Sequence, residues 1–315
     1  MGFDTAYEAL TEESDTHRWA FGTGFTDPLA GVDTSVPEGV DGADLAAYCL
    51  MLGDDALIMS HRLQEWLSRA PELEEDTALA NIALDLLGQA RLLLTRAGAA
   101  DGSGRTEDDL AFGRAEREFR NVRLAEITDA DFAALVARLL VFSIWRLALL
   151  VALRDSADPV LAAIAAQGVK EVTYHRDYAA QWVIRLGDGT DFSRERMVAA
   201  LAAVAPFVAE LFAVSPVERR LAGAGVAVNP AGVRAEFDDV ITVVLAEAGL
   251  DGAGSDTESP AAGSGTGSAG RVWPSVPGLA GVSGQMGREG VHTEAMGYVV
   301  AELQSVARSL PGATW

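Results

Sequence analysis

The stretch PELEEDTALANIALDLLGQARLLLTRAG, residues 71–98, decides the fold class. Its apolar residues recur at the three- and four-residue steps of an α-helix. Pro71 suits the first turn of a helix, and the acidic residues after it complement the positive end of the helix dipole. Gly98 is typical of a helix end. The stretch therefore predicts one helix, roughly 40 Å long at 1.5 Å per residue.

Three other segments carry the same periodicity over comparable lengths, and shorter helical patterns follow them. Runs of alternating β-branched residues, which would indicate strands, are absent from the sequence. The pattern therefore predicts an all-α fold, a long four-helix bundle with additional C-terminal helices. The expected helices are 45–66, 71–97, 128–154 and 158–186 in the bundle, followed by 193–212, 230–248 and 292–310.

The most apolar stretch, residues 132–153, is interrupted by Arg138 and Arg146. A membrane span needs about 20 apolar residues, so we expect a buried helix and no membrane contact. Thr128, with Asp131 three residues later, resembles a capping box and predicts that this helix starts at residue 128.

The charge and cysteine content of the chain limit the functions it can have. The 315 residues include 46 acidic and 24 basic side chains, a net charge of −22. A surface this acidic repels phosphate backbones, so we expect no nucleic-acid partner. The chain starts with neither a basic segment nor an apolar signal core. The single cysteine, Cys49, cannot form an internal disulfide, so we expect a cytoplasmic protein.

Composition shifts divide the chain into four parts. Residues 1–43 are acidic and carry no helical period, so they predict a disordered tail. Residues 44–250 form the helical bundle, and the Gly/Ser-rich residues 251–270 have the composition of a linker. Residues 271–315 form a C-terminal segment whose helix we expect to pack on the bundle.

Long four-helix bundles often hold a di-metal site, built from two single Glu ligands and two Glu-x-x-His pairs. The chain has four histidines, and only Glu289 and His292 show that spacing, in a glycine-rich loop. One pair does not complete such a centre. We therefore predict no metal ligand and no catalytic residue in this chain.

Polar side chains stand where such ligands would lie. Asn81, Asp85 and Gln89 form one stripe on helix 71–97. Because buried polar groups need partners, we interpret the stripe as part of an internal network, with a metal site and a partner-facing seam as alternatives. The candidate network residues are Asp54, Asp55, Asp85, Glu171, Tyr174 and His175, with Arg91, Arg146 and Arg176 as their expected partners.

Residues 114–121, RAEREFRN, place three arginines around one aromatic residue. This arrangement suits an anionic ligand such as a phosphate-bearing cofactor tail. The alternative is a solvated charged face with internal ion pairs. Tyr174, Tyr178 and Trp182 recur at four-residue steps, which favours a core or interface over a cofactor site.

Several runs together resemble one known family, the PaaC subunits of the multicomponent phenylacetyl-CoA epoxidase, also called phenylacetate-CoA oxygenase. The similarity covers about residues 44–250 and 284–315. The runs are LGDDALIMSHRLQEW (52–66), PELEEDTALANIALDLLGQAR (71–91), AFGRAEREFRN (111–121), KEVTYH (170–175), RLGDGTD (185–191), GVHTEAMGYVVAELQ (290–304) and the terminal LPGATW.

The resemblance implies a ferritin-like bundle that has lost its iron ligands and supports a homologous catalytic oxygenase subunit. That partner keeps the di-iron centre, small accessory subunits join it, and a reductase carrying FAD and an iron–sulfur centre supplies electrons from NADPH. The complex epoxidises the ring of phenylacetyl-CoA with O2. A self-sufficient di-iron oxygenase with an irregular ligand set (Asp54 or Asp55, Asp85, Glu171, His175) and a purely docking assembly protein are the competing hypotheses.

The resemblance also carries over to positions in this chain. Asp85-x-x-Gly88 and Glu171-x-x-Tyr174 stand where helix-borne ligand pairs are expected. The motif at 111–121 implies that part of the segment lies near the CoA, at or near the interface with the partner. The residues so implicated are Arg117, Glu118, Phe119, Arg120 and Asn121.

Overall fold

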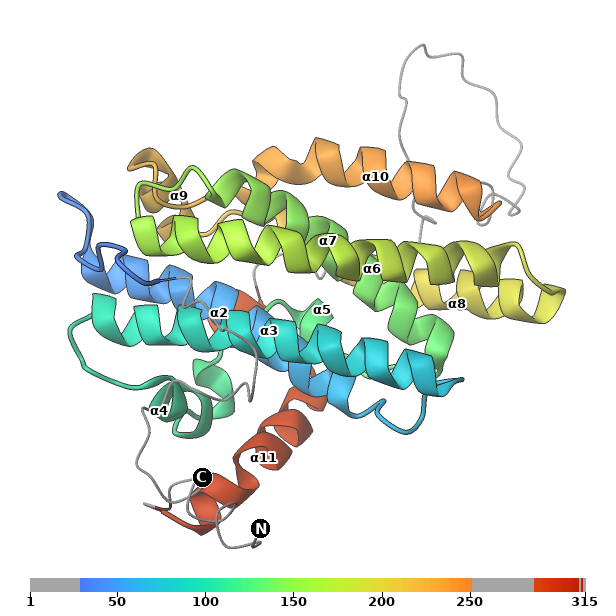
Figure 1. Cartoon of the computed structure of the whole chain (residues 1–315), viewed down its shortest axis with the longest axis horizontal. Coiled ribbons are helices and arrows are strands. Elements are labelled where there is room, and N and C mark those ends of the chain that lie inside the picture. Colours follow the sequence, from blue (N-terminus) through green and yellow to red (C-terminus); the bar gives the residue numbers. More distant parts are fainter. Residues whose placement is uncertain (1–28, 251–285, 312, 314–315) are drawn as a thin grey trace, which may run out of the picture.

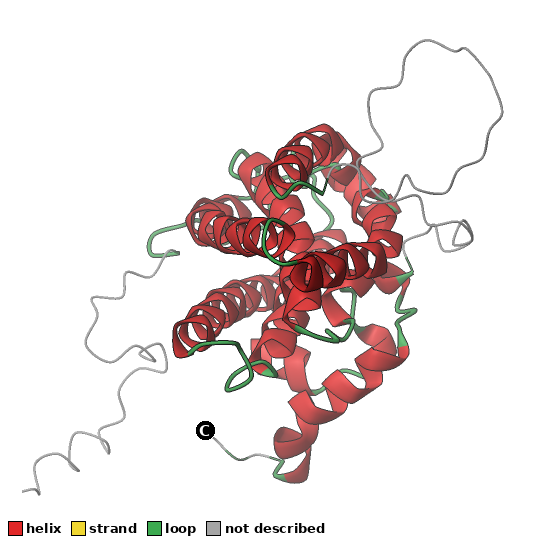
Figure 2. Cartoon of the chain, turned by 90° about the vertical axis from the view of Figure 1, so that its right-hand side faces the viewer, coloured by secondary structure: helices red, strands yellow, loops and turns green. Residues whose placement is uncertain are grey.

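The computed structural model describes residues 29–250, 286–311 and 313, so the predicted linker 251–270 lies outside the described residues. The described part contains helices and loops and no strand (Figures 1 and 2). Its α-helices are α2 (Gly42–Gln64), α3 (Leu73–Ala100), α4 (Glu107–Phe112), α5 (Arg123–Glu126), α6 (Phe132–Leu153), α7 (Pro159–Gly187), α8 (Asp191–Val208), α9 (Pro216–Gly223), α10 (Arg234–Glu247) and α11 (Glu294–Ser309). Four 3-10 turns accompany them, namely η1 (Glu116–Glu118), η2 (Ala209–Phe212), η3 (Pro230–Val233) and η4 (Gly287–Glu289).

Four long helices form the bundle, as the sequence predicts. Helix α2 packs on α3, α6 packs on α7, and α3 joins the two pairs by contacting α7. Helices α8 and α10 cover the α6/α7 pair, while α11 lies beside α4 at the opposite side of the molecule (Figure 1). The all-α prediction is confirmed, and the arrangement is compatible with a ferritin-like bundle.

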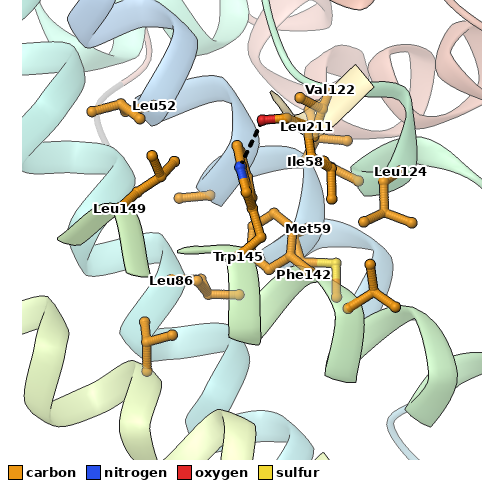
Figure 3. Packing of buried hydrophobic residues seen from close by; sticks show 14 of the residues in the cluster. Leu52, Ile58, Met59, Leu86, Val122, Leu124, Phe142, Trp145, Leu149 and Leu211 are labelled. Atoms are coloured by element: carbon orange, nitrogen blue, oxygen red, sulfur yellow. Dashed lines mark hydrogen bonds between the residues drawn. The ribbon is translucent and has the colours of Figure 1, made fainter. Parts of the chain in front are cut away.

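Helix α6 supplies the centre of the core. Trp145 is buried against α2 residues such as Ile58 and Met59, and its indole Nε1 donates to the Leu211 carbonyl at 2.8 Å (Figure 3). By length and composition α3 and α6 could each cross a membrane, but 89% of the most apolar window of α6 is buried inside the protein. The apolar surface of α6 thus forms the protein core.

The two arginines inside α6 are buried in the same core. The guanidinium of Arg138 forms an ion pair with the carboxylate of Asp129, in which Nε donates to Oδ1 at 2.8 Å. Arg146 donates from Nε to the side-chain oxygen of Gln89 at 2.9 Å. Both arginines are therefore hydrogen-bonded inside the protein, which offsets part of the cost of burying them.

Several helix boundaries differ from the sequence prediction. Helix α6 begins at residue 132 because Asp131 caps it, accepting from the Ala134 N–H at 2.9 Å, so the predicted start at Thr128 is wrong. The short helices α4, α5 and α9 were not predicted, since one or two turns give no readable period. Residues 29–41, assigned to the disordered tail, instead pack on the core through Val32, Val36 and Val40.

Gly98 does not end its helix, which continues to residue 100. A Cβ at this position would lie 1.9 Å from the Arg105 carbonyl oxygen, so the glycine allows the loop after α3 to fold back against the helix. Gly104 N–H donates to the Gly98 carbonyl at 3.2 Å, which holds that loop in place. Gly98, which the sequence predicted as a helix end, is instead a position where two backbone segments approach closely.

We predict that Gly98→Ala lowers the free energy of unfolding by about 1–3 kcal/mol, the usual cost of overpacking. Gly88→Ala, in the same helix, is the matched control because a Cβ there has no atom within 4 Å. That change should raise stability by up to about 1 kcal/mol, since alanine favours helix. Urea unfolding midpoints measure both, and an equal effect of the two substitutions would contradict this account.

Candidate functional site

The middle of α2 carries two adjacent carboxylates with no solvent exposure, Asp54 and Asp55. Asp54 accepts from both terminal nitrogens of Arg114, with Nη1 to Oδ2 at 2.9 Å, and from the Arg120 backbone N–H at 2.8 Å. The segment that follows α4 therefore reaches into the bundle and closes over the first carboxylate.

Asp55 is also bound by an arginine, which comes from a different part of the chain. Arg288 on η4 donates to both carboxylate oxygens, at 2.9 and 2.8 Å, and the Val122 backbone N–H adds a bond of 2.8 Å. Burial raises the pKa of Asp55, and the charges of Arg288 and Arg146 together with these hydrogen bonds oppose that rise. Each aspartate thus has a fixed cation as its neighbour.

Between α3 and α7 the polar residues form two further connections. His175 Nε2 lies 3.0 Å from the Asp85 carboxylate. Glu171 accepts from Gln89 Nε2 at 2.8 Å, and Gln89 in turn accepts from Arg146. Burial lowers the pKa of Arg146 to about 10, so it remains a cation at neutral pH.

The structure brings together only part of the expected network. Tyr174 is 50% exposed and lies on the outer face of α7. Arg146 joins the network as expected, through Gln89. Arg91 and Arg176 do not, because they pair instead with Glu107 and Asp177. Arginines 114 and 288, which were not expected there, hold the two α2 aspartates.

These residues do not fit a di-iron centre. Among the described residues no group of three His, Cys, Asp or Glu side chains converges on a common point. A metal at Asp54 or Asp55 would have to displace a guanidinium, and Asp85 with His175 supplies one carboxylate and one imidazole. The donor set therefore favours internal ion pairs over metal coordination.

Most residues of segment 117–121, implicated in CoA binding, are buried or bonded within the protein. Phe119 and Asn121 are buried and structural, with Asn121 Nδ2 donating to Glu126 at 2.8 Å. Arg120 donates from Nη1 to the backbone carbonyls of residues 117 and 119, both at 2.8 Å. Glu118 accepts from the Ala115 N–H at 2.7 Å, which caps η1.

Arg117 differs from its neighbours. Its side chain is exposed, and among the described residues no hydrogen bond or ion pair of its guanidinium is found. It therefore retains all its donors for an external anion.

Comparison with known proteins shows which family this chain belongs to. A family model described as "Phenylacetic acid catabolic protein" matches residues 33–263. The chain is 40% identical over 271 residues to the C subunit of 1,2-phenylacetyl-CoA epoxidase from Escherichia coli (strain K12), a match that covers 86% of this chain and 99% of that protein. The chain belongs to this family of phenylacetic acid catabolic proteins.

Membership confirms the resemblance found in the sequence. The family match begins before α2 and runs past α10, so it includes the helices that carry Asp54, Asp55, Asp85 and Glu171. The similarity to the epoxidase subunit extends over most of the chain, so this family member is comparable with that relative throughout the bundle and not only in one motif.

We predict that Arg288→Met lowers the free energy of unfolding by about 3–5 kcal/mol, because it leaves the buried Asp55 carboxylate without its cation. The loss should shrink as pH falls, since burial favours the neutral carboxyl. Arg105→Met is the control, because this arginine is 45% exposed and pairs with Asp101 at the surface. Its cost should stay below about 1 kcal/mol. Equal losses in urea unfolding would contradict the assignment.

Proposed function

We propose that this chain is a structural, non-catalytic subunit of a phenylacetyl-CoA 1,2-epoxidase, in which it supports a homologous di-iron catalytic partner. One observation carries the proposal. Asp54 and Asp55, two fully buried carboxylates in the middle of α2, are bound by Arg114 and Arg288, so cations of the protein itself occupy the places where a metal would bind these carboxylates. The E. coli relative, named as an epoxidase subunit, supports the assignment to that complex.

The proposal divides the chemistry between proteins. Di-iron would belong to the catalytic subunit, while NADPH, FAD and an iron–sulfur centre would belong to the associated reductase. This chain would contribute a rigid bundle that holds the catalytic subunit in register, since oxygen activation needs a fixed and dry site. We also propose that the complex is cytoplasmic, because its reductant and its acyl-CoA substrate are soluble molecules.

The experiment compares the complex reconstituted with wild-type chain and with the double variant Asp85→Asn, Glu171→Gln. The proposal predicts unchanged turnover per assembled complex and unchanged iron content, because neither carboxylate would ligate metal. A variant that assembles normally but loses iron or turnover would instead support a self-sufficient di-iron oxygenase. Size-exclusion chromatography of the mixture separates loss of assembly from loss of chemistry.

We further propose that Arg117 contacts a phosphate of the CoA. Removing one charged hydrogen bond costs about 1.5–3 kcal/mol, so Arg117→Ala should raise KM for phenylacetyl-CoA by roughly 10- to 100-fold with little change in kcat. Arg219→Ala is the matched control, also an exposed arginine, on α9. An unchanged KM for the Arg117 variant would favour a chain that only docks.

A further inference from the structure

His292 lies at the junction between the C-terminal segment and the bundle. Its side chain is 1% exposed and faces the fully buried carboxylate of Glu126 on α5. Nδ1 lies 2.7 Å from Glu126 Oε2, and Nε2 lies 3.2 Å from the Phe119 carbonyl oxygen. Both ring nitrogens therefore face acceptors.

With Glu126 ionised, this geometry favours the doubly protonated ring. A neutral imidazole carries one N–H, so either tautomer would leave a ring lone pair pointing at an oxygen. Only the imidazolium donates to both oxygens. A doubly protonated ring also neutralises Glu126, a buried carboxylate whose other donors, the amide of Asn121 and the backbone N–H of Thr293, carry no charge.

The surrounding charges are of both signs. Glu116 on η1 adds a second negative charge near the ring, which favours the protonated ring, whereas the guanidinium of Arg120 beside Gly290, two residues before the histidine, opposes it. Burial lowers the pKa of His292, but the hydrogen bonds to Glu126 and Phe119 and the charges of Glu126 and Glu116 outweigh it, so the pKa lies above its usual 6.5.

The contact joins the start of α11 to the segment that follows α4. The Thr293 N–H donates to the second oxygen of Glu126, so the N-cap of α11 is held by the same carboxylate. Farther along α11, Gln304 donates to the carbonyls of Ala111 and Arg114 at 3.0 and 2.9 Å. The contacts of Gln304 do not titrate, so His292 controls only the first turn.

We infer that the His292–Glu126 ion pair is a proton-controlled latch, which docks the N-terminal turn of α11 onto residues 116–126 and releases it when the imidazolium is deprotonated. The inference concerns the fold of this chain and stands independently of the proposed function. Because residues 117–121 form part of the docked surface, release would also loosen the segment that carries Arg117.

The direction of the pH effect follows from linkage. The docked state holds the proton with a pKa above 6.5, while in the released state the histidine returns to about 6.5. Below 6.5 both states are protonated and docking is at its tightest. Between the two pKa values the ratio of released to docked molecules should rise about tenfold per pH unit, and above the docked pKa it should level off.

The experiment measures hydrogen exchange of α11 amides in the full chain between pH 6 and pH 9, corrected for the intrinsic pH dependence of exchange. In parallel, NMR of the protein labelled with 13C-histidine follows the ring titrations. The expected result is a His292 midpoint above 6.5, with protection of the first turn of α11 lost over the same pH range. Protection near Gln304 should change less.

His292→Gln removes the titrating group and should give weaker protection that no longer depends on pH. His175→Gln is the control, since His175 lies on α7, where it pairs with Asp85 away from α11, and should leave the pH profile of α11 unchanged. If His292→Gln does not fold, the His292 signal is assigned by elimination with His17, His61 and His175 variants. A His292 midpoint at or below 6.5, or protection that stays flat through its titration, would overturn the latch.

Discussion

The structure depends on the burial of two adjacent carboxylates, Asp54 and Asp55, in the middle of α2. A buried charge is costly unless a partner of opposite charge reaches it with good hydrogen-bond geometry. Arg114 reaches Asp54 from the segment after α4, and Arg288 reaches Asp55 from η4 in the C-terminal segment. The carboxylates therefore determine where both segments lie, and those segments in turn position Phe119, Asn121 and His292.

The same interaction separates this chain from a metal-binding bundle. A guanidinium is a cation of fixed charge attached to the backbone, and it satisfies carboxylate oxygens that a metal ion would otherwise bind. Arg146 extends this arrangement toward α3 and α7, where it contacts Glu171 through Gln89. The interior thus keeps its charge balance with residues of its own, and its rigidity does not require an added ion.

The sequence predicted the helices well because long apolar periodicity is a local property. It also identified Asp54, Asp55 and His175 as buried polar residues, whereas Asp85 and Glu171, expected in the same interior, are partly exposed. It could not identify their partners, since Arg114 lies 60 residues from Asp54 and Arg288 lies 233 residues from Asp55. Arg91 and Arg176, which lie close in sequence to Asp85 and Glu171, were plausible by helix spacing but pair with other acids. The prediction that the helix ends at Gly98 was wrong for a similar reason. This glycine allows close contact with a loop, and the helical periodicity does not reveal that contact.

Iron content per chain, measured by elemental analysis on the protein expressed alone with added iron, tests the central claim most directly. If arginines occupy the carboxylates in place of a metal, the purified chain should contain close to no iron. About two irons per chain, the content of a di-iron bundle, would contradict the account. In that case Asp85, Glu171 and His175 would have to leave their present partners to coordinate the metal.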